Sequence, residues 1–300
     1  MITLLVNPVA GSRKAKNVAI SVVERLKELN LPYRVWETHY PNEAKELALR
    51  AAKEHQQDPQ KDNMLLSIGG DGTFLEVVQG VMGSDLPVAS LPAGTGNDFL
   101  KSLGVPLEPM AALEHILNAK VRKIDIGKVN DLIFANECGA GFDVTTLDYA
   151  NQYRKKIRGS ASYLLGVLAA IFRHRSAPMV IKADGKEVFR GSCLVFSVAN
   201  GQYIGGGIRI SPEADVESGK LELIVLQDCP RPRMLFNYLP RLLGGKILQF
   251  KDTVVHCRAD AVSVSHMQEG ETLRINIDGE IRDLPKCEFS ILPHTLPIRM

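Results

Sequence analysis

Residues 65–78 read Leu65-Leu66-Ser67-Ile68-Gly69-Gly70-Asp71-Gly72-Thr73-Phe74-Leu75-Glu76-Val77-Val78, and they decide the fold of the N-terminal part of the chain. An apolar run ends in a glycine-rich turn, and a helical pattern follows. Glycines allow the backbone to approach an anion closely, and main-chain amides at the start of a helix bind phosphate groups. Asp71 lies among these glycines, where it can bind Mg²⁺ or orient a phosphate. The turn is neither a Walker A loop nor a GxGxxG fingerprint, so an ordinary strand-to-helix turn is the alternative.

Two further apolar runs end in the same way. One run, residues 87–91, closes in Leu91-Pro92-Ala93-Gly94-Thr95-Gly96-Asn97-Asp98-Phe99, and the other stands at the N-terminus as Leu4-Leu5-Val6-Asn7-Pro8-Val9-Ala10-Gly11-Ser12. In an open parallel sheet, ligands bind beyond the carboxyl ends of the strands. Three polar, glycine-bearing loops at one edge therefore predict a nucleotide site, although turn chemistry explains each loop taken alone.

The pattern of elements changes after about Lys120. Before it, strands alternate with helices, which predicts an α/β domain with a parallel sheet covered by helices. The expected strands are 2–6, 33–38, 64–68 and 87–91, and the expected helices are 14–29 and a helix from the cap residue Asn42 to about His55. After it, short β-rich segments dominate, with Asp184-Gly185 as a hairpin turn and helical insertions near 148–174 and 234–243. This second part predicts an antiparallel two-sheet sandwich.

The composition is that of a globular protein, without the excess of basic residues that is typical of nucleic-acid binding. The chain has 300 residues, 45% of them hydrophobic, and a formal net charge of +2. A nearly neutral chain gives no reason to expect a nucleic-acid partner. The five cysteines are scattered and form no Cys-x-x-Cys pair, which is typical of reduced thiols in a cytoplasm. Met1 leads straight into a strand pattern without a signal peptide, so we expect a cytoplasmic protein, free or peripheral at the inner membrane face.

Six motifs follow one another in an order that resembles one known family. They are Asn7-Pro8 to Gly11, Gly69 to Thr73, Gly94 to Asp98, Ile124-Asp125-Ile126-Gly127, Gly205-Gly206-Gly207 with Ile210-Ser211-Pro212-Glu213-Ala214, and Asp278-Gly279-Glu280. With them the chain resembles the diacylglycerol kinase catalytic family of bacterial lipid kinases, which is related to sphingosine, ceramide and NAD kinases. The resemblance implies an NAD-kinase-like nucleotide domain over residues 1–124, joined by the tail 291–300, and a β-rich lipid-substrate domain over residues 125–290.

The resemblance also implies a reaction and a set of site residues. The reaction is transfer of the γ-phosphoryl of ATP to a lipid hydroxyl with Mg²⁺, which needs nucleotide positioning, a metal and a base. Asp71 then belongs to the ATP–Mg²⁺ group, and Asp125 is a further metal candidate. Asp278 or Glu280 is the base and the other belongs to a hydrogen-bond or metal network, with an Asp-Gly hairpin turn as the alternative. The implied nucleotide-binding residues are Asn7, Pro8, Gly11, Thr38, Gly69, Gly70, Gly72, Thr73, Gly94, Thr95 and Asp98. A strand-end role for Thr38 and a helix-cap role for Asp98 stay open as alternatives.

One loop departs from the family pattern. Some members carry two aspartates before a glycine and bind a structural Mg²⁺ there, whereas this chain has Glu217-Ser218-Gly219. Ser218 replaces a ligating carboxylate, and the loss of a carboxylate weakens a site for a hard cation. The remaining candidate ligands are Glu217 and the carbonyls of Asp215 and Lys220, beside Ser218 itself.

The sequence leaves the acceptor and the partners open. Diacylglycerol is the leading acceptor by family, beside phosphatidylglycerol, a sphingoid base or a polyprenol-like alcohol. We expect a lipid substrate at a membrane surface, and a homodimer is compatible with the sequence. Two basic and apolar segments, 153–175 and 231–246, suit an anionic membrane surface, or they are amphipathic helices packed on a sheet. A soluble NAD-type kinase and a catalytically silent nucleotide-binding regulator are the alternative functions.

Overall fold

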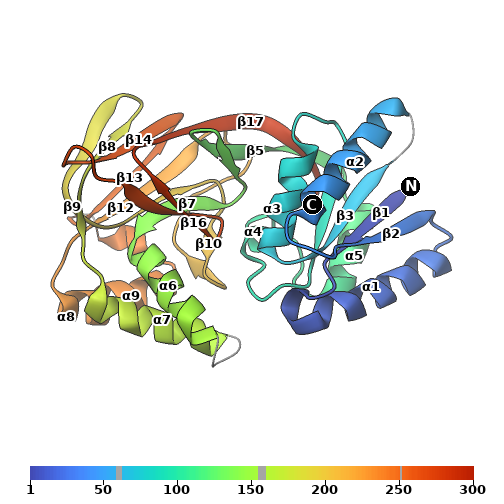
Figure 1. Cartoon of the computed structure of the whole chain (residues 1–300), viewed down its shortest axis with the longest axis horizontal. Coiled ribbons are helices and arrows are strands. Elements are labelled where there is room, and N and C mark those ends of the chain that lie inside the picture. Colours follow the sequence, from blue (N-terminus) through green and yellow to red (C-terminus); the bar gives the residue numbers. More distant parts are fainter. Residues whose placement is uncertain (59–62, 155–159, 251) are drawn as a thin grey trace. The chain divides into compact units, whose positions relative to one another are not determined.

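The chain divides into two units, which are described separately. The first unit is Met1–Ile126 together with Pro293–Met300, and the second is Gly127–Leu292. The computed structural model describes residues 1–58, 63–154, 160–250 and 252–300. Two strands, β5 (Val121–Val129) and β17 (Cys287–Arg299), run from one unit into the other (Figure 1). Within the described ranges, no helix combines the length and the hydropathy that crossing a bilayer requires.

The first unit is built on a parallel sheet, as the alternating pattern predicts. Its strands are β1 (Ile2–Val6), β2 (Tyr33–Glu37), β3 (Met64–Gly69) and β4 (Val88–Pro92). They lie in the order β2-β1-β3-β4, and the end of β17 joins in parallel where Ile298 pairs with Val88. Strands β1, β3 and β4 are buried along their whole length, as expected for strands covered on both faces.

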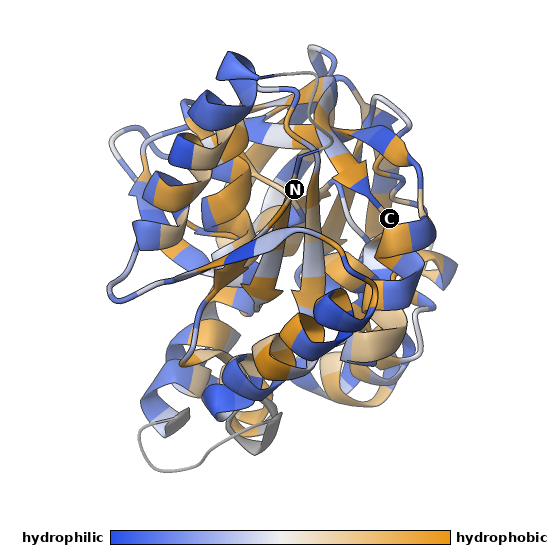
Figure 2. Cartoon of the chain, turned by 90° about the vertical axis from the view of Figure 1, so that its right-hand side faces the viewer, coloured by the Kyte–Doolittle hydropathy of each residue, from blue (hydrophilic) through white to orange (hydrophobic). Residues whose placement is uncertain are grey.

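Helices cover both faces of this sheet (Figure 1). They are α1 (Ala10–Glu28), α2 (Glu43–Gln57), α3 (Asp71–Val81), α4 (Asp98–Ser102) and α5 (Pro109–Asn118). Helices α1 and α5 share a core with alternate residues of β1, for example Leu4 with Val22 and Leu113. Helices α2 and α3 pack against each other, and a side chain at Gly80 of α3 would collide with the backbone of α2. Figure 2 shows hydrophobic strands at the centre and hydrophilic residues on the outer sides of the helices.

Of two expected helix starts, one is confirmed and the other needs correction. Residues 11–13 of α1 have left-handed φ angles, so the regular helix begins at Lys14 as the pattern predicts. Asn42 does precede α2, but its side chain makes no capping hydrogen bond. The carboxylate of Glu76 on α3 instead accepts the N–H of Ala44 at 3.2 Å. A tertiary contact thus takes the role that the local pattern assigned to Asn42.

The second unit is a two-sheet β structure, which confirms the expected fold class. Its main strands are β6 (Leu132–Phe134), β7 (Glu137–Gly141), β8 (Ala177–Ala183), β9 (Lys186–Ala199), β12 (Leu221–Gln227), β13 (Val254–Ala259), β14 (Ala261–His266), β15 (Leu273–Ile277) and β16 (Glu280–Leu284). The N-terminal half of β9 pairs with β8, and its C-terminal half pairs with β7 and β12. The long strand therefore belongs to both sheets, and Phe196 and Phe289 meet in the core between them. Asp184 and Gly185 form the expected β8–β9 turn with φ values of 47° and 78°.

Helices cover one outer face of this unit. They are α6 (Phe142–Arg154), α7 (Ser160–Arg173), α8 (Arg231–Arg233), the π-helical η1 (Met234–Tyr238), α9 (Leu239–Leu243) and the short η2 (Ile247–Gln249). Val167 and Ile171 of α7 and Met234 and Tyr238 of η1 share one hydrophobic cluster with Val195 of β9. A small separate hairpin, β10 (Tyr203–Ile204) with β11 (Ile208–Arg209), carries the triple glycine at its tip.

Candidate functional site

Four strands of the first unit end at the same edge of the sheet. The register pairs Val6 with Glu37 and with Ile68, and Gly69 with Pro92. Main-chain hydrogen bonds continue past these ends, from Asn7 to Ile68, from Thr38 to Val6 and from Ala93 to Gly69. All the loops that carry predicted nucleotide-binding residues therefore begin at one edge, where a parallel sheet binds its ligands.

Glycines bring these loops into direct contact. A side chain at Gly94 would collide with the Cα atom of Gly70, and one at Gly11 would collide with the carbonyl oxygen of Ala93. Gly11 also has a φ of 57°. Any larger residue at either position has to displace backbone, so the three loops meet only because these residues are glycines.

Two amide side chains hold the loops in place. The Asn7 Nδ2 atom donates to Thr73 Oγ1 at 3.0 Å, which ties the first loop to the start of α3. The Asn97 Oδ1 atom accepts the N–H of Gly94 at 3.0 Å, and its Nδ2 donates to the Gly94 carbonyl at 3.2 Å. Asn97 itself is buried with a φ of 51°. Thr95 stays exposed on the loop that Asn97 clamps.

The carboxylates of Asp71 and Asp98 converge at Gly96. A Cβ atom at Gly96 would lie 3.0 Å from Asp71 Oδ2 and 3.3 Å from Asp98 Oδ2. Burial, and secondly the charge of Asp98, raises the pKa of Asp71, while N–H groups of residues 97–99 oppose this shift. Two neighbouring carboxylates that repel each other form a favourable place for a cation.

Asp98 is not the cap of the helix that follows it. The N-cap position of α4 is Asn97, and the N–H of Phe99 donates to Asp71 Oδ1 at 3.2 Å. Asp98 forms an ion pair with Lys101 at 2.8 Å. Asp71 therefore caps a helix that starts 27 residues after it, a contact that only the folded sheet edge creates.

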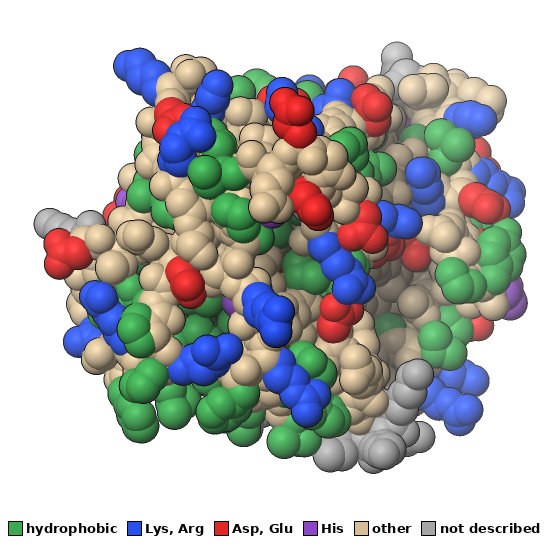
Figure 3. Space-filling view, turned by 60° about the vertical axis from the view of Figure 1, so that its left-hand side comes forward, with side chains coloured by type: hydrophobic (Ala, Val, Ile, Leu, Met, Phe, Trp, Pro, Cys, Tyr) green, Lys and Arg blue, Asp and Glu red, His purple; other side chains and the backbone are tan. Residues whose placement is uncertain are grey.

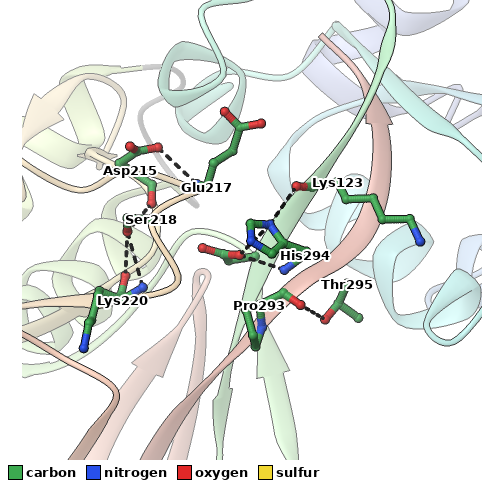
Figure 4. Close-up of polar contacts among 9 residues, drawn as sticks. Lys123, Asp215, Glu217, Ser218, Lys220, Pro293, His294 and Thr295 are labelled. Atoms are coloured by element: carbon green, nitrogen blue, oxygen red, sulfur yellow. Dashed lines mark hydrogen bonds and ion pairs between the residues drawn. The ribbon is translucent and has the colours of Figure 1, made fainter.

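Asp125 of β5 is buried and is bound by the tail of the chain. Its Oδ1 atom accepts the N–H of His294 at 2.8 Å, and the His294 ring lies 3.7 Å from the same oxygen (Figure 4). In the described part of the chain, no three acidic, histidine or cysteine residues gather as a metal site. Asp125 is thus not grouped with Asp71 and Asp98 as a third ligand.

The loop around Ser218 is closed by its own hydrogen bonds. The Ser218 hydroxyl lies 2.8 Å from the Asp215 carbonyl and 3.3 Å from the Lys220 carbonyl, both within donating distance (Figure 4). The Asp215 carboxylate accepts the N–H of Glu217, and the Lys220 ammonium pairs with Asp260. The serine hydroxyl has one proton, which the shorter distance directs to the Asp215 carbonyl, so this loop holds one of the carbonyls that a cation would need by its own hydrogen bond.

The Asp278-Gly279-Glu280 motif forms the tight turn between β15 and β16. Asp278 and Gly279 have φ values of 47° and 96°. The Asp278 carboxylate accepts the N–H groups of Ala135 at 2.6 Å, Asn136 at 3.1 Å and Glu137 at 2.8 Å. Glu280 is exposed and lies 2.9 Å from the Arg282 guanidinium. The hairpin alternative is thus correct for the backbone, and the two acids have different surroundings.

The comparisons with known proteins cover the whole chain. The diacylglycerol kinase catalytic domain matches residues 1–129, and the YegS C-terminal NAD kinase beta sandwich-like domain matches residues 136–300. The chain belongs to the diacylglycerol kinase family of lipid kinases. It is 33% identical to a Pseudomonas aeruginosa protein named "Probable lipid kinase YegS-like", over 79% of this chain and 76% of that one. It is 28% identical to a protein of Mycobacterium tuberculosis named "Diacylglycerol kinase", over 99% and 94% of the two chains.

Solved structures agree on the fold of this lipid kinase. A structure described as a diacylglycerol kinase from Bacillus anthracis has a TM-score of 0.72 at 21% identity and covers 99% of this chain and 96% of its own. An NAD kinase from Archaeoglobus fulgidus in complex with ATP has a TM-score of 0.54 at 17% identity, covering 100% and 94%.

Two acids of the lipid kinase were not identified from the sequence. Glu137 is buried at the start of β7 beside Ser197, and Asp143 lies in the first turn of α6 beside Asn276. Burial, then the charge of Asp143, raises the pKa of Glu137 well above its ordinary value, and burial raises that of Asp143 to about 6. The available signal was an acidic residue opening the strand 137–141, which is otherwise made of small residues.

Proposed function

We propose that this lipid kinase transfers the γ-phosphoryl group of ATP to the hydroxyl group of a lipid at a membrane surface, with diacylglycerol as the leading acceptor. The observation that carries the proposal is the loop arrangement of the first unit. Three glycine-bearing loops touch one another at the carboxyl edge of a parallel sheet, and two carboxylates converge among them. At the nucleotide, phosphoryl transfer requires the protein mainly to position the phosphates and to compensate their negative charge.

The nucleotide phosphates bind to main-chain amides at Gly70 and Gly72, beside Gly94, whose own N–H is held by Asn97. The start of α3 adds the partial positive charge of a helix N-terminus. Asn7 and Thr73 hold the rim through their mutual hydrogen bond. Pro8, Gly11, Thr38, Gly69 and Thr95 complete the proposed nucleotide site.

A divalent cation fits the pair of carboxylates in the same unit. The repulsion between Asp71 and Asp98 that raises the pKa of Asp71 is what a bound cation would relieve. Mg²⁺ binds through one or two carboxylates together with substrate phosphates, so two acids are enough. When bound, the metal supplies compensation of the phosphate charge. We assign no metal role to Asp125 or to the Ser218 loop.

Glu280 is the proposed base, and Asp278 positions it. Every oxygen of the Asp278 carboxylate accepts at least one main-chain N–H, so this side chain is committed to holding the turn. Glu280 is solvent-exposed at the end of that fixed turn, and among the described residues it pairs with the exposed Arg282. A carboxylate that removes the proton of an acceptor hydroxyl has to be accessible to that hydroxyl.

The test is phosphorylation of a lipid panel dispersed in micelles, with ATP and Mg²⁺. The panel contains diacylglycerol, phosphatidylglycerol, a sphingoid base and a polyprenol, and NAD is added in a separate reaction. Wild type is compared with Asp71→Asn and Glu280→Gln, and with the controls Asp85→Asn and Asp283→Asn, which alter exposed acids. A phosphorylated lipid that is lost in the first two variants only supports the proposal. Phosphorylated NAD, or ATP binding without any product, contradicts it.

A further inference from the structure

In the second unit, helix α7 and the helical segment 231–243 (α8, η1 and α9) each pack one face against the sheet and leave the opposite face exposed. Val167 and Ile171 on α7, and Met234 and Tyr238 on η1, are buried in a shared cluster against the sheet. The two helices are neighbours, since the Arg231 guanidinium donates to the carbonyl of Phe172 at 3.3 Å. Packing on a sheet therefore explains these inward residues, and an amphipathic helix of this kind should turn polar residues outward.

The outward residues include large hydrophobic side chains instead. Phe236 is 73% exposed, Phe172 64%, Leu243 58% and Leu168 41%. Single exposed hydrophobic residues need no explanation, but several on adjoining helices mark an interaction surface.

The charge of the same segments has one sign. Residues 165–175 and 231–246 together contain six Arg and Lys and no Asp or Glu, whereas the whole chain has a net charge of only +2. The rest of the chain is therefore net negative. Figure 3 shows hydrophobic and basic side chains gathered along the lower edge of the visible face.

The arginines of these segments contact backbone and rings. Arg241 donates to Asn237 and lies 4.8 Å from the Phe250 ring centroid. Arg233 lies 5.6 Å from the Tyr238 ring and Arg173 lies 5.3 Å from the Tyr149 ring. Within the described ranges, no ion pair ties these three arginines to a carboxylate, and the nearby Asp228 accepts from Ser176. Their charge is thus available to an anionic partner.

We propose that this surface docks on an anionic lipid bilayer. We call it the basic–aromatic face. It consists of Leu168, Phe172, Arg173, Arg231, Arg233, Phe236, Arg241, Leu243 and Lys246. Basic side chains beside exposed Phe and Leu match a surface where anionic headgroups border acyl chains. The inference rests on the proposed function, because it supplies the contact that brings the kinase to a lipid acceptor. Residues 155–159 of the first basic segment lie outside the described residues and are not part of the face.

The experiment is flotation with vesicles in the absence of ATP, so that it does not depend on turnover. The vesicles contain phosphatidylcholine alone or phosphatidylcholine with phosphatidylglycerol. Wild type should float with the anionic vesicles and dissociate from them as salt is added. Arg233→Glu should weaken binding about fivefold or more, from the contribution of one basic residue near an anionic surface. Phe236→Ser should weaken it about tenfold, from the lost insertion of one aromatic ring.

Matched substitutions elsewhere in the second unit show whether a change in binding comes from the basic–aromatic face or from any loss of surface charge or hydrophobic area. Lys186→Glu and Met267→Ser change an exposed basic residue and a 45% exposed hydrophobic residue in other elements, and both should bind as wild type does. Unchanged binding by Phe236→Ser and Arg233→Glu, or equal flotation with both kinds of vesicle, overturns the inference. A wild-type dimer that Phe236→Ser converts to a monomer also overturns it, because a second copy then covers the face. Kinase activity of wild type on the lipid panel in micelles tests the proposed function separately, because flotation without ATP measures docking alone.

Discussion

Exchanging Asp278 and Glu280 one at a time for their amides should damage different properties of the enzyme. The Asp278 carboxylate accepts three main-chain N–H groups, from Ala135, Asn136 and Glu137. An Asn side chain offers one accepting oxygen, and its NH₂ group would face an N–H donor. Each hydrogen bond to a charged group contributes about 1.5–3 kcal/mol, so losing one or two should lower the free energy of unfolding by about 3 kcal/mol. Glu280 pairs with the exposed Arg282, and its exchange should change that free energy by less than about 1 kcal/mol.

Urea unfolding and kinase assays on both variants measure the contrast. Glu280→Gln should unfold at the wild-type urea concentration, while its kcat falls by a factor of about 10²–10⁴, the usual contribution of general base catalysis. Asp278→Asn should unfold at a lower urea concentration and keep part of its turnover, because the base is displaced but present. Asp283→Asn on the same strand serves as the control.

Two results would refute the reasoning. The first is an Asp278→Asn variant as stable as wild type, since the carboxylate would then not hold the turn. The second is a Glu280→Gln variant that keeps its turnover, since the base would then be another group.

Three further predictions concern single positions. Gly94→Ala should destabilise the first unit by about 1–3 kcal/mol and weaken ATP binding in calorimetry, because the new Cβ collides with Gly70. Gly72→Ala is the control: a Cβ there has open space around it, so the variant should keep wild-type stability. Burial is the largest cause that raises the pKa of the Glu222 carboxyl, to about 7. The folded state therefore binds the Glu222 proton more tightly than the unfolded state does. The resulting stabilisation is present at low pH and is lost as the pH rises to about 7. Glu222→Gln should therefore match wild type in thermal melts below about pH 4 and exceed it by roughly 3 kcal/mol above about pH 8, whereas a constant difference at every pH would contradict this. Ser218→Asp should show a larger Mg²⁺-dependent rise in Tm than wild type does, because the added carboxylate creates a cation site in its loop, whereas an equal Mg²⁺ response of the two proteins would contradict this account of the loop.

The sequence predicted the elements of the first unit well because their signals are local. Buried strands with glycine-rich ends and helices with one apolar face are visible in a short window. The loops at 7–12, 69–73 and 93–98 were assigned to one edge because parallel strands place their carboxyl ends together. The glycine contacts between the loops agree with that expectation, since they depend on the same register.

The sequence could not supply contacts between distant residues. Glu76 binds the N–H of Ala44, which the local pattern assigned to Asn42, and Asp71 binds that of Phe99, for which a cap role of Asp98 was one open alternative. Asp278 accepts hydrogen bonds from residues that lie more than 140 positions before it. The sequence alone therefore did not decide which of Asp278 and Glu280 is the base. The buried acid Glu137 was overlooked because a single carboxylate in a short strand carries no periodic signal.

The most direct test of the account is transfer of radiolabelled γ-phosphate from ATP to diacylglycerol in micelles, by wild type, Asp71→Asn and Glu280→Gln. The account predicts a labelled, chloroform-soluble product with wild type and at least a hundredfold less with either variant, because the first removes charge at the nucleotide and the second removes the base. Labelled lipid formed equally by all three proteins would contradict the assignment of both residues. Binding of ATP by wild type without label in any lipid of the panel would contradict the proposed reaction itself.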